Sequence, residues 1–184
     1  TEFSIRWKLP KGLVISAGGG DVACGGIGIG AVNQKTGFIS LGTSAQVFLG
    51  SKKFEPSPKN LVHSFCHALP ETWFDMAALL NGTSVMDAVL RWTSEKNIES
   101  LISSAEQKFQ GPGSLLALPY LSGERTPHND NQIRGAIVGL SHATVTEDIT
   151  LAFLESIAFS LADGLDALLA NNSRPERLIL IGGG

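Results

Sequence analysis

An aspartate follows a run of glycines near the start of the chain, in the segment Gly18–Asp21 (GGGD). The apolar, β-branched run 13–17 precedes it, and the small residues of 21–32 follow, so we expect Asp21 to open a helix directly after a strand. The partial positive charge at a helix N-terminus stabilises an ionised carboxylate, and such a group could take a proton from a bound hydroxyl. Asp21 is therefore a candidate general base, and the alternative is a residue that only caps its helix.

Two other strand-like runs also end in glycine. Gly42–Ser44 (GTS) follows the run 37–41, and Gly182–Gly184 follows the run 178–181. Glycine lets backbone N–H groups approach an anion, and the two hydroxyls of GTS add donors. These segments predict contacts to a nucleotide, although GTS alone could be an ordinary turn. The chain contains neither the dinucleotide fingerprint G-x-G-x-x-G nor a P-loop, so another kind of cradle is expected.

The segment Ser122–His128 (SGERTPH) places polar side chains directly after an apolar run. Arg125 could meet a phosphate or a sugar hydroxyl, and Glu124 could pair with it. The alternative is an ion pair that braces a loop. The nearby pattern HSFCH (63–67) has no second Cys or His cluster to complete a metal shell, so we do not expect a zinc site.

Periodicity predicts a layered α/β protein that would position these residues. Turn residues separate the strand-like runs between 37 and 80, which indicates antiparallel pairs. We expect Thr146 to cap a long helix with one apolar side, and we expect the last strand to be buried. The expected strands are 13–17, 37–41, 46–49, 61–68, 73–80, 115–121, 136–140 and 178–181, and the expected helices are 21–32, 83–95, 98–109 and 147–171.

Composition excludes several classes of protein. The chain has 184 residues, 43% of them apolar, and a formal net charge of −3, which suits one domain or a large part of a longer protein. The lack of a long basic run disfavours nucleic acid or an anionic membrane as partner, and acidic residues interrupt the longest apolar segment. Two cysteines, Cys24 and Cys66, form no disulfide framework, which favours a reduced, cytoplasmic compartment.

Taken in order, the motifs resemble the C-terminal half of the FGGY family of carbohydrate kinases, from about Leu13 to the end of the chain. VHSFCHALP and LPYLSGERTPH are specific for the branch that acts on xylulose. One departure is Phe153, where the family usually has a smaller or aliphatic residue, and this affects helix packing more than chemistry. The resemblance depends on GGGD with its small-residue helix (18–31), SLGTS (40–44), VHSFCHALP (62–70), LPYLSGERTPH (118–128), GAIVGL (135–140) with the helix that contains Asp148 and Glu155, and the terminal GGG (182–184).

This resemblance implies the actin-like, ribonuclease-H-like fold, with a mixed sheet flanked by helices and a second domain that closes over a cleft. It implies transfer of the γ-phosphate of ATP, with Mg²⁺, to a hydroxyl of a ketopentose, D-xylulose being the expected substrate, and no metal ligands from this chain alone. Asp21 is then the expected catalytic base. The expected phosphate and nucleotide contacts are Gly42, Thr43, Ser44, Gly82, Gly183 and Gly184, and the candidates for the substrate side of the cleft are Gly20, Glu124 and Arg125.

By the same resemblance, residues 1–12 lead in from an N-terminal sugar-binding domain, and residues 13–184 form an incomplete C-terminal domain. We therefore expect a piece truncated at both ends, inactive by itself, with sugar and ATP as partners of the whole enzyme and with a homodimer left open. The alternatives are a related kinase for ribulose, gluconate or a polyol, and a noncatalytic nucleotide-binding module. Such a module would have no need of the Asp21 carboxylate.

Overall fold

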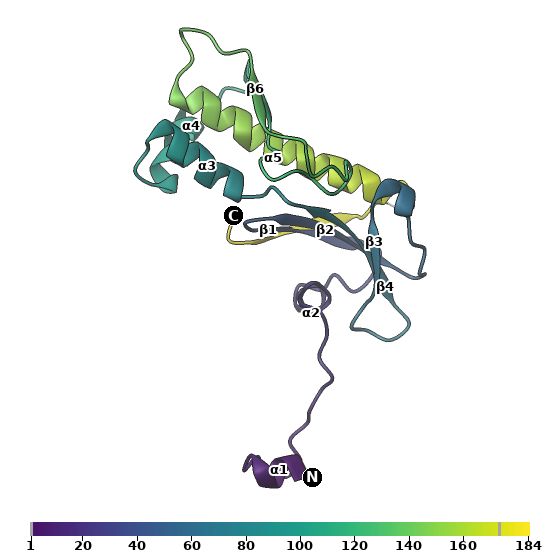
Figure 1. Ribbon diagram of the computed structural model, residues 1–184. Coiled ribbons are helices and arrows are strands. Elements are labelled where there is room, and N and C mark those ends of the chain that lie inside the picture. The colour runs from purple at the N-terminus through teal and green to yellow at the C-terminus, as the bar shows by residue number, and fades with distance from the viewer. Residues whose placement is uncertain (1, 173) are drawn as a thin grey trace.

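A five-stranded mixed sheet with helices on both faces forms the body of the computed structural model, which describes residues 2–172 and 174–184 (Figure 1). Helices α3, α4 and α5 lie over one face, and α2 lies under the other. The elements in chain order are α1 (Glu2–Arg6), α2 (Asp21–Gly28), β1 (Thr36–Leu41), β2 (Ala45–Ser51), η1 (Pro58–Asn60), β3 (His63–Cys66), β4 (Trp73–Leu79), α3 (Ser84–Thr93), α4 (Ile98–Lys108), β5 (Leu116–Leu118), β6 (Ala136–Val138), α5 (Thr146–Leu169) and β7 (Arg177–Gly182).

The strand order is β3-β4-β2-β1-β7, and every neighbouring pair is antiparallel except the parallel pair β1 and β7. The expected antiparallel pairs between 37 and 80 are therefore confirmed. Because β4 and β7 run in the same direction as β1, the carboxyl ends of these three strands meet at one edge, which we call the carboxyl edge. The turn Gly42–Ser44 lies at this edge, since β1 ends and β2 begins there. The short strands β5 and β6 form a separate antiparallel pair beside α5.

Alternation along β2 and β4 divides the apolar residues between the two faces. On the α5 face, Val47 and Leu79 are buried against the long helix, and Gly164 lets the helix backbone approach because it has no side chain. On the α2 face, the ring of Phe48 lies between those of Phe38 and Phe74, with centroid distances of 4.5 and 4.8 Å. Small residues of α2, such as Ala23, pack against this aromatic cluster, so the small-residue helix lies close beneath the sheet.

The expected strand at 13–17 is wrong. Residues 9–20 form no strand, and Val14 is 89% exposed. A strand requires a partner for its backbone N–H and C=O groups, and no described segment pairs with this one. It instead forms an extended arm between α2 and the exposed helix α1 (Figure 1).

The last strand forms where expected, but its expected burial is wrong. β7 is an edge strand, and Leu180 on its α5 face is 61% exposed. The described helices cover that face of the inner strands more fully than they cover β7. The apolar pattern therefore predicted the strand correctly but did not show whether a helix packs on it.

The long helix begins at Thr146 and is capped differently from the prediction. Val145 is the N-cap residue, and the Asp148 carboxylate accepts a hydrogen bond of 3.0 Å from the Val145 backbone N–H. Its predicted apolar side is confirmed, since Phe153 and Ile157 are buried. No helix of the described residues is both long and apolar enough to span a bilayer.

Candidate active site

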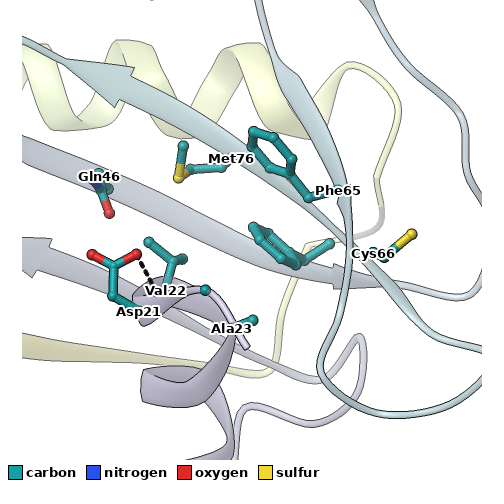
Figure 2. A pocket seen from close by; sticks show the side chains of 9 residues that line it. Asp21, Val22, Ala23, Gln46, Phe65, Cys66 and Met76 are labelled. Atoms are coloured by element: carbon teal, nitrogen blue, oxygen red, sulfur yellow. Dashed lines mark hydrogen bonds between the residues drawn. The ribbon is translucent and has the colours of Figure 1, made fainter. Parts of the chain in front are cut away.

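The carboxylate of Asp21 is exposed at the first turn of α2, where it lines a cavity of about 470 Å³ on the α2 face of the sheet (Figure 2). One oxygen, Oδ1, accepts a hydrogen bond of 2.9 Å from the backbone N–H of Val22. The N-cap residue is Gly20, which lines the same cavity. Asp21 therefore meets a helix N-terminal amide, as expected, while its other oxygen has no protein partner among the described residues.

The glycines predicted to contact a nucleotide come together at the carboxyl edge. The N–H of Gly82 donates to Thr43 O at 3.1 Å, and the N–H of Thr83 donates to Gly42 O at 2.8 Å. The N–H of Gly184 donates to Leu41 O at 3.2 Å. The β1–β2 turn is thus held between the start of α3 and the end of β7.

Two glycines are required by this packing. A Cβ on Gly82 would lie 2.8 Å from the carbonyl carbon of Ser44. Cβ atoms in proteins essentially never come this close to a backbone atom. Gly182 has a φ of +117°, a conformation that favours glycine, and its backbone lies against Leu41. The hydroxyl-bearing residues Thr43 and Ser44 remain exposed at the turn.

A second cavity, of about 440 Å³, lies on the α5 face of the same edge. Gly183, Gly184 and Thr83 line its backbone side, and Met86 and Asp87 of α3 belong to its wall. The remaining lining residues are aliphatic: Leu41, Ile98, Ile102, Leu154, Ile157, Ala158 and Leu161. A largely apolar slot with glycine backbone at one end suits a flat ring more than a charged group.

The Asp21 cavity and the terminal-glycine cavity lie on opposite faces of the sheet, with the β1–β2 turn at the edge between them. Gln46, two residues after Ser44, faces the Asp21 cavity, while Leu41, directly before the turn, faces the other. A ligand that contacts both cavities must therefore pass over this turn.

Glu124 does not lie in either cavity. It is 2% exposed, and its carboxylate accepts hydrogen bonds from the N–H of Leu80 at 2.6 Å and from the side chain of Asn81 at 3.0 Å. Arg125 is exposed, and no ion pair joins the two side chains in the described part of the chain. The predicted Glu124–Arg125 pair is therefore wrong: Glu124 braces the loop by fixing the backbone directly before Gly82.

Among residues 2–172 and 174–184, no group of three or more His, Cys, Asp or Glu side chains is arranged to hold a metal ion. His67, which belongs to the HSFCH segment, is buried against the rings of Phe48 and Phe74.

Sequence reasoning missed Gln46, Phe65 and Met76, which line the Asp21 cavity. A signal for Gln46 was available. Residues 46 and 48 lie on the same face of a strand, so a polar side chain at 46 shares the face of the buried Phe48. Phe65 and Met76 gave no such signal, because apolar residues are ordinary in strands.

Comparison with known proteins identifies the family and the fold of the chain. A family model described as the C-terminal domain of the FGGY family of carbohydrate kinases matches residues 37–184. The chain is 42% identical over 183 residues to the xylulose kinase of Escherichia coli (strain K12), covering 100% of this chain and 38% of that protein. The xylulose kinase of Klebsiella pneumoniae is 40% identical with the same coverage. The chain thus spans little more than a third of the length of these relatives.

Solved structures share the fold. A protein described as a xyloylose kinase from Brucella ovis is 38% identical, with a TM-score of 0.92, covering 100% of this chain and 38% of that one. A gluconate kinase from Lactobacillus acidophilus has a TM-score of 0.86 at 23% identity, with 100% and 37% coverage, and at that identity it shows the fold alone. The actin-like ATPase fold expected from the motifs is therefore present, and the chain belongs to the FGGY family of carbohydrate kinases, whose C-terminal domain it matches.

Proposed function

We propose that the whole protein to which this chain belongs is an ATP-dependent sugar kinase that converts a ketopentose, D-xylulose, to its 5-phosphate. The observation that carries this proposal is the exposed Asp21 carboxylate in a cavity at the same sheet edge as the β1–β2 turn. The choice of xylulose is supported by relatives of that name at 40–42% identity. Because the chain spans only part of those relatives, the sugar and the overall reaction are assigned to the whole protein.

In this mechanism Asp21 takes the proton of the hydroxyl that attacks the γ-phosphorus. The new bond joins the sugar oxygen to the phosphorus, the bond from the γ-phosphorus to the β–γ bridging oxygen breaks, and ADP leaves. The Val22 N–H donates a hydrogen bond to Oδ1 and so orients the carboxylate, while the other oxygen stays free to accept the proton. Such general-base assistance contributes about 10²–10⁴-fold to the rate.

The nucleotide is assigned to the other side of the turn. The aliphatic cavity beside Gly183 and Gly184 suits the adenine ring, and exposed Thr43 and Ser44 suit the phosphates. In this orientation the phosphate chain crosses the turn, and its terminal phosphorus reaches the face that carries Asp21. Gly42 and Gly82 keep the turn and the start of α3 close together.

Among the described residues that line the Asp21 cavity, Asp21 supplies the one carboxylate, which is too little for a resident metal site. Mg²⁺ commonly binds through one or two carboxylates together with substrate phosphates, so Asp21 fits an ion that arrives with ATP. When bound, the ion neutralises charge on the transferred phosphoryl group. We assign the enzyme to the cytoplasm, with sugar and ATP as its binding partners.

Asp21→Asn in the whole enzyme tests the proposal, because it keeps the shape of the side chain and removes its ability to accept the proton. We expect kcat to fall by about 10²–10⁴-fold with an unchanged thermal midpoint. Asp166→Asn is a matched control, since Asp166 is an exposed aspartate near the C-terminal end of α5. A coupled ADP assay with D-xylulose, D-ribulose, gluconate and polyols identifies the acceptor.

Near-normal kcat in Asp21→Asn would contradict the general-base role. A wild-type enzyme that consumes no ATP with any of these acceptors, while binding the nucleotide, would instead support the noncatalytic module. Preferred turnover of gluconate or a polyol would leave the kinase chemistry in place and overturn the choice of xylulose.

A further inference from the structure

The cavity beside Asp21 contains one other strongly hydrogen-bonding side chain, Gln46. Apart from the sulfur of Cys66, the other side chains that line it are apolar: Val22, Ala23, Phe65, Phe74 and Met76. Figure 2 shows the amide end of Gln46 directed toward the Asp21 carboxylate, with Met76 and Phe65 on the far wall. No hydrogen bond joins the amide to the carboxylate or to another described residue, so the two polar groups face the same cavity without meeting.

The position of Gln46 is rigid. It lies near the start of β2, paired with Ser40 of β1 on one side and with Ala78 of β4 on the other. Its neighbours Ala45 and Val47 are buried on the opposite face, at 1% and 0% exposure. The strand pairing therefore fixes the direction of the Gln46 side chain toward the α2 face.

A glutamine is an unexpected residue at this point. The same face of the sheet is built from aromatic rings and a methionine, and apolar side chains there pack against α2. The amide of Gln46 is partly exposed and faces the cavity without a hydrogen-bond partner among the described residues, so its donor and acceptor groups are available to a ligand. A polar side chain on an otherwise apolar face of a sheet is typical of a position that contacts a ligand.

We propose that Gln46 determines acceptor specificity: its side-chain amide hydrogen-bonds the sugar hydroxyl next to the one that Asp21 deprotonates. This inference depends on the proposed kinase function and names a further contact of the same site. In a ketopentose phosphorylated at C5, the neighbouring group is the C4 hydroxyl. That hydroxyl both donates and accepts a hydrogen bond, and a primary amide can match either role. The apolar wall of Phe65 and Met76 suits the C–H surface of the sugar.

The test compares the whole enzyme with Gln46→Leu, which keeps similar bulk and removes the amide. We expect kcat/KM for D-xylulose to fall about ten-fold, the effect of one neutral hydrogen bond, while KM for ATP stays constant. Gln107→Leu is the control, because Gln107 is an exposed glutamine on α4, away from both cavities. A thermal melt of each variant confirms folding.

The decisive measurement uses 4-deoxy-D-xylulose, which lacks the proposed partner of the amide. Wild type should lose about ten-fold in kcat/KM with this analogue, and Gln46→Leu should lose almost nothing further, because each change removes the same hydrogen bond. A purely structural role would leave the two losses additive.

Additive losses, a change confined to KM for ATP, or a Gln46→Leu enzyme that matches wild type with D-xylulose would each overturn the inference and leave the kinase assignment intact. A wild-type enzyme that phosphorylates no ketose would overturn the proposed function, and the inference would fall with it.

Discussion

Gly82→Ala tests whether the β1–β2 turn keeps its shape because the start of α3 packs directly on its backbone. An alanine Cβ at this position would lie 2.8 Å from the carbonyl carbon of Ser44 and 2.9 Å from its oxygen. The carbonyl oxygen of Gly42 would lie closer still to this Cβ. Carbon atoms in contact prefer at least about 3.5 Å, so the turn and α3 must separate by at least roughly 0.7 Å, the difference from the 2.8 Å to the Ser44 carbon. The backbone hydrogen bonds from Gly82 and Thr83 to the turn oppose that movement.

Two effects should follow in the whole enzyme. Forcing atoms into a packed site costs about 1–3 kcal/mol of the free energy of unfolding. A shift approaching 1 Å in a positioning element can cost up to about 10²-fold in rate, and we expect this loss in kcat/KM for ATP. Urea denaturation measures the first effect. Initial rates at varied ATP, taken well below the thermal midpoint, measure the second.

Gly113→Ala is the control for this experiment. Its Cβ would have no neighbour closer than 4.0 Å, and its φ lies outside the left-handed region. A loop change of this kind is neutral or stabilises by up to about 1 kcal/mol. If Gly82→Ala matched wild type in both stability and kcat/KM for ATP, the argument that backbone crowding fixes the turn would be refuted.

The parts of the fold that depend on nearby residues could be predicted from the sequence. Strand-like runs separated by turn residues identified β1, β2 and β4, and the helical period identified α3, α4 and α5. The glycine-ended runs were also predicted, because a strand followed by glycines is visible in the sequence itself. The convergence of Gly82 and Gly184 on the β1–β2 turn then follows from the sheet, which brings the carboxyl ends of β1, β4 and β7 to one edge.

Features that depend on a distant partner could not be predicted in this way. The run 13–17 has the composition of a strand, yet without a pairing segment it is exposed. Glu124 and Arg125 are adjacent in sequence and opposite in charge, which suggested an ion pair. The carboxylate instead binds the N–H of Leu80, 44 residues earlier, because the loop folds back over the end of β4. A buried carboxylate is stabilised by such backbone donors as well as by an ion pair.

The remaining predictions concern stability. Glu124→Gln places an N–H donor where the carboxylate accepts hydrogen bonds, so we expect the free energy of unfolding in urea to fall by about 1–3 kcal/mol with unchanged kcat/KM. A large loss of activity without unfolding would instead indicate that Glu124 contacts the substrate. Phe48→Ala empties the aromatic cluster beneath β2 and should cost about 3–5 kcal/mol, whereas a loss under about 1 kcal/mol would show that the site has collapsed around the change. At Asp148, hydrogen bonds from Lys108 at 2.6 Å and from the Val145 N–H at 3.0 Å lower the pKa of the carboxyl. A lowered folded-state pKa stabilises the protein above the unfolded-state pKa, and this stabilisation is lost as pH falls through the folded-state value. Asp148→Asn should therefore reduce stability near neutral pH and have less effect in acid, with a difference below about 1 kcal/mol because Lys108 is half exposed. Thermal midpoints of wild type and variant across the acid range measure this effect, and a pH-independent gap between them would show that the ion pair contributes nothing.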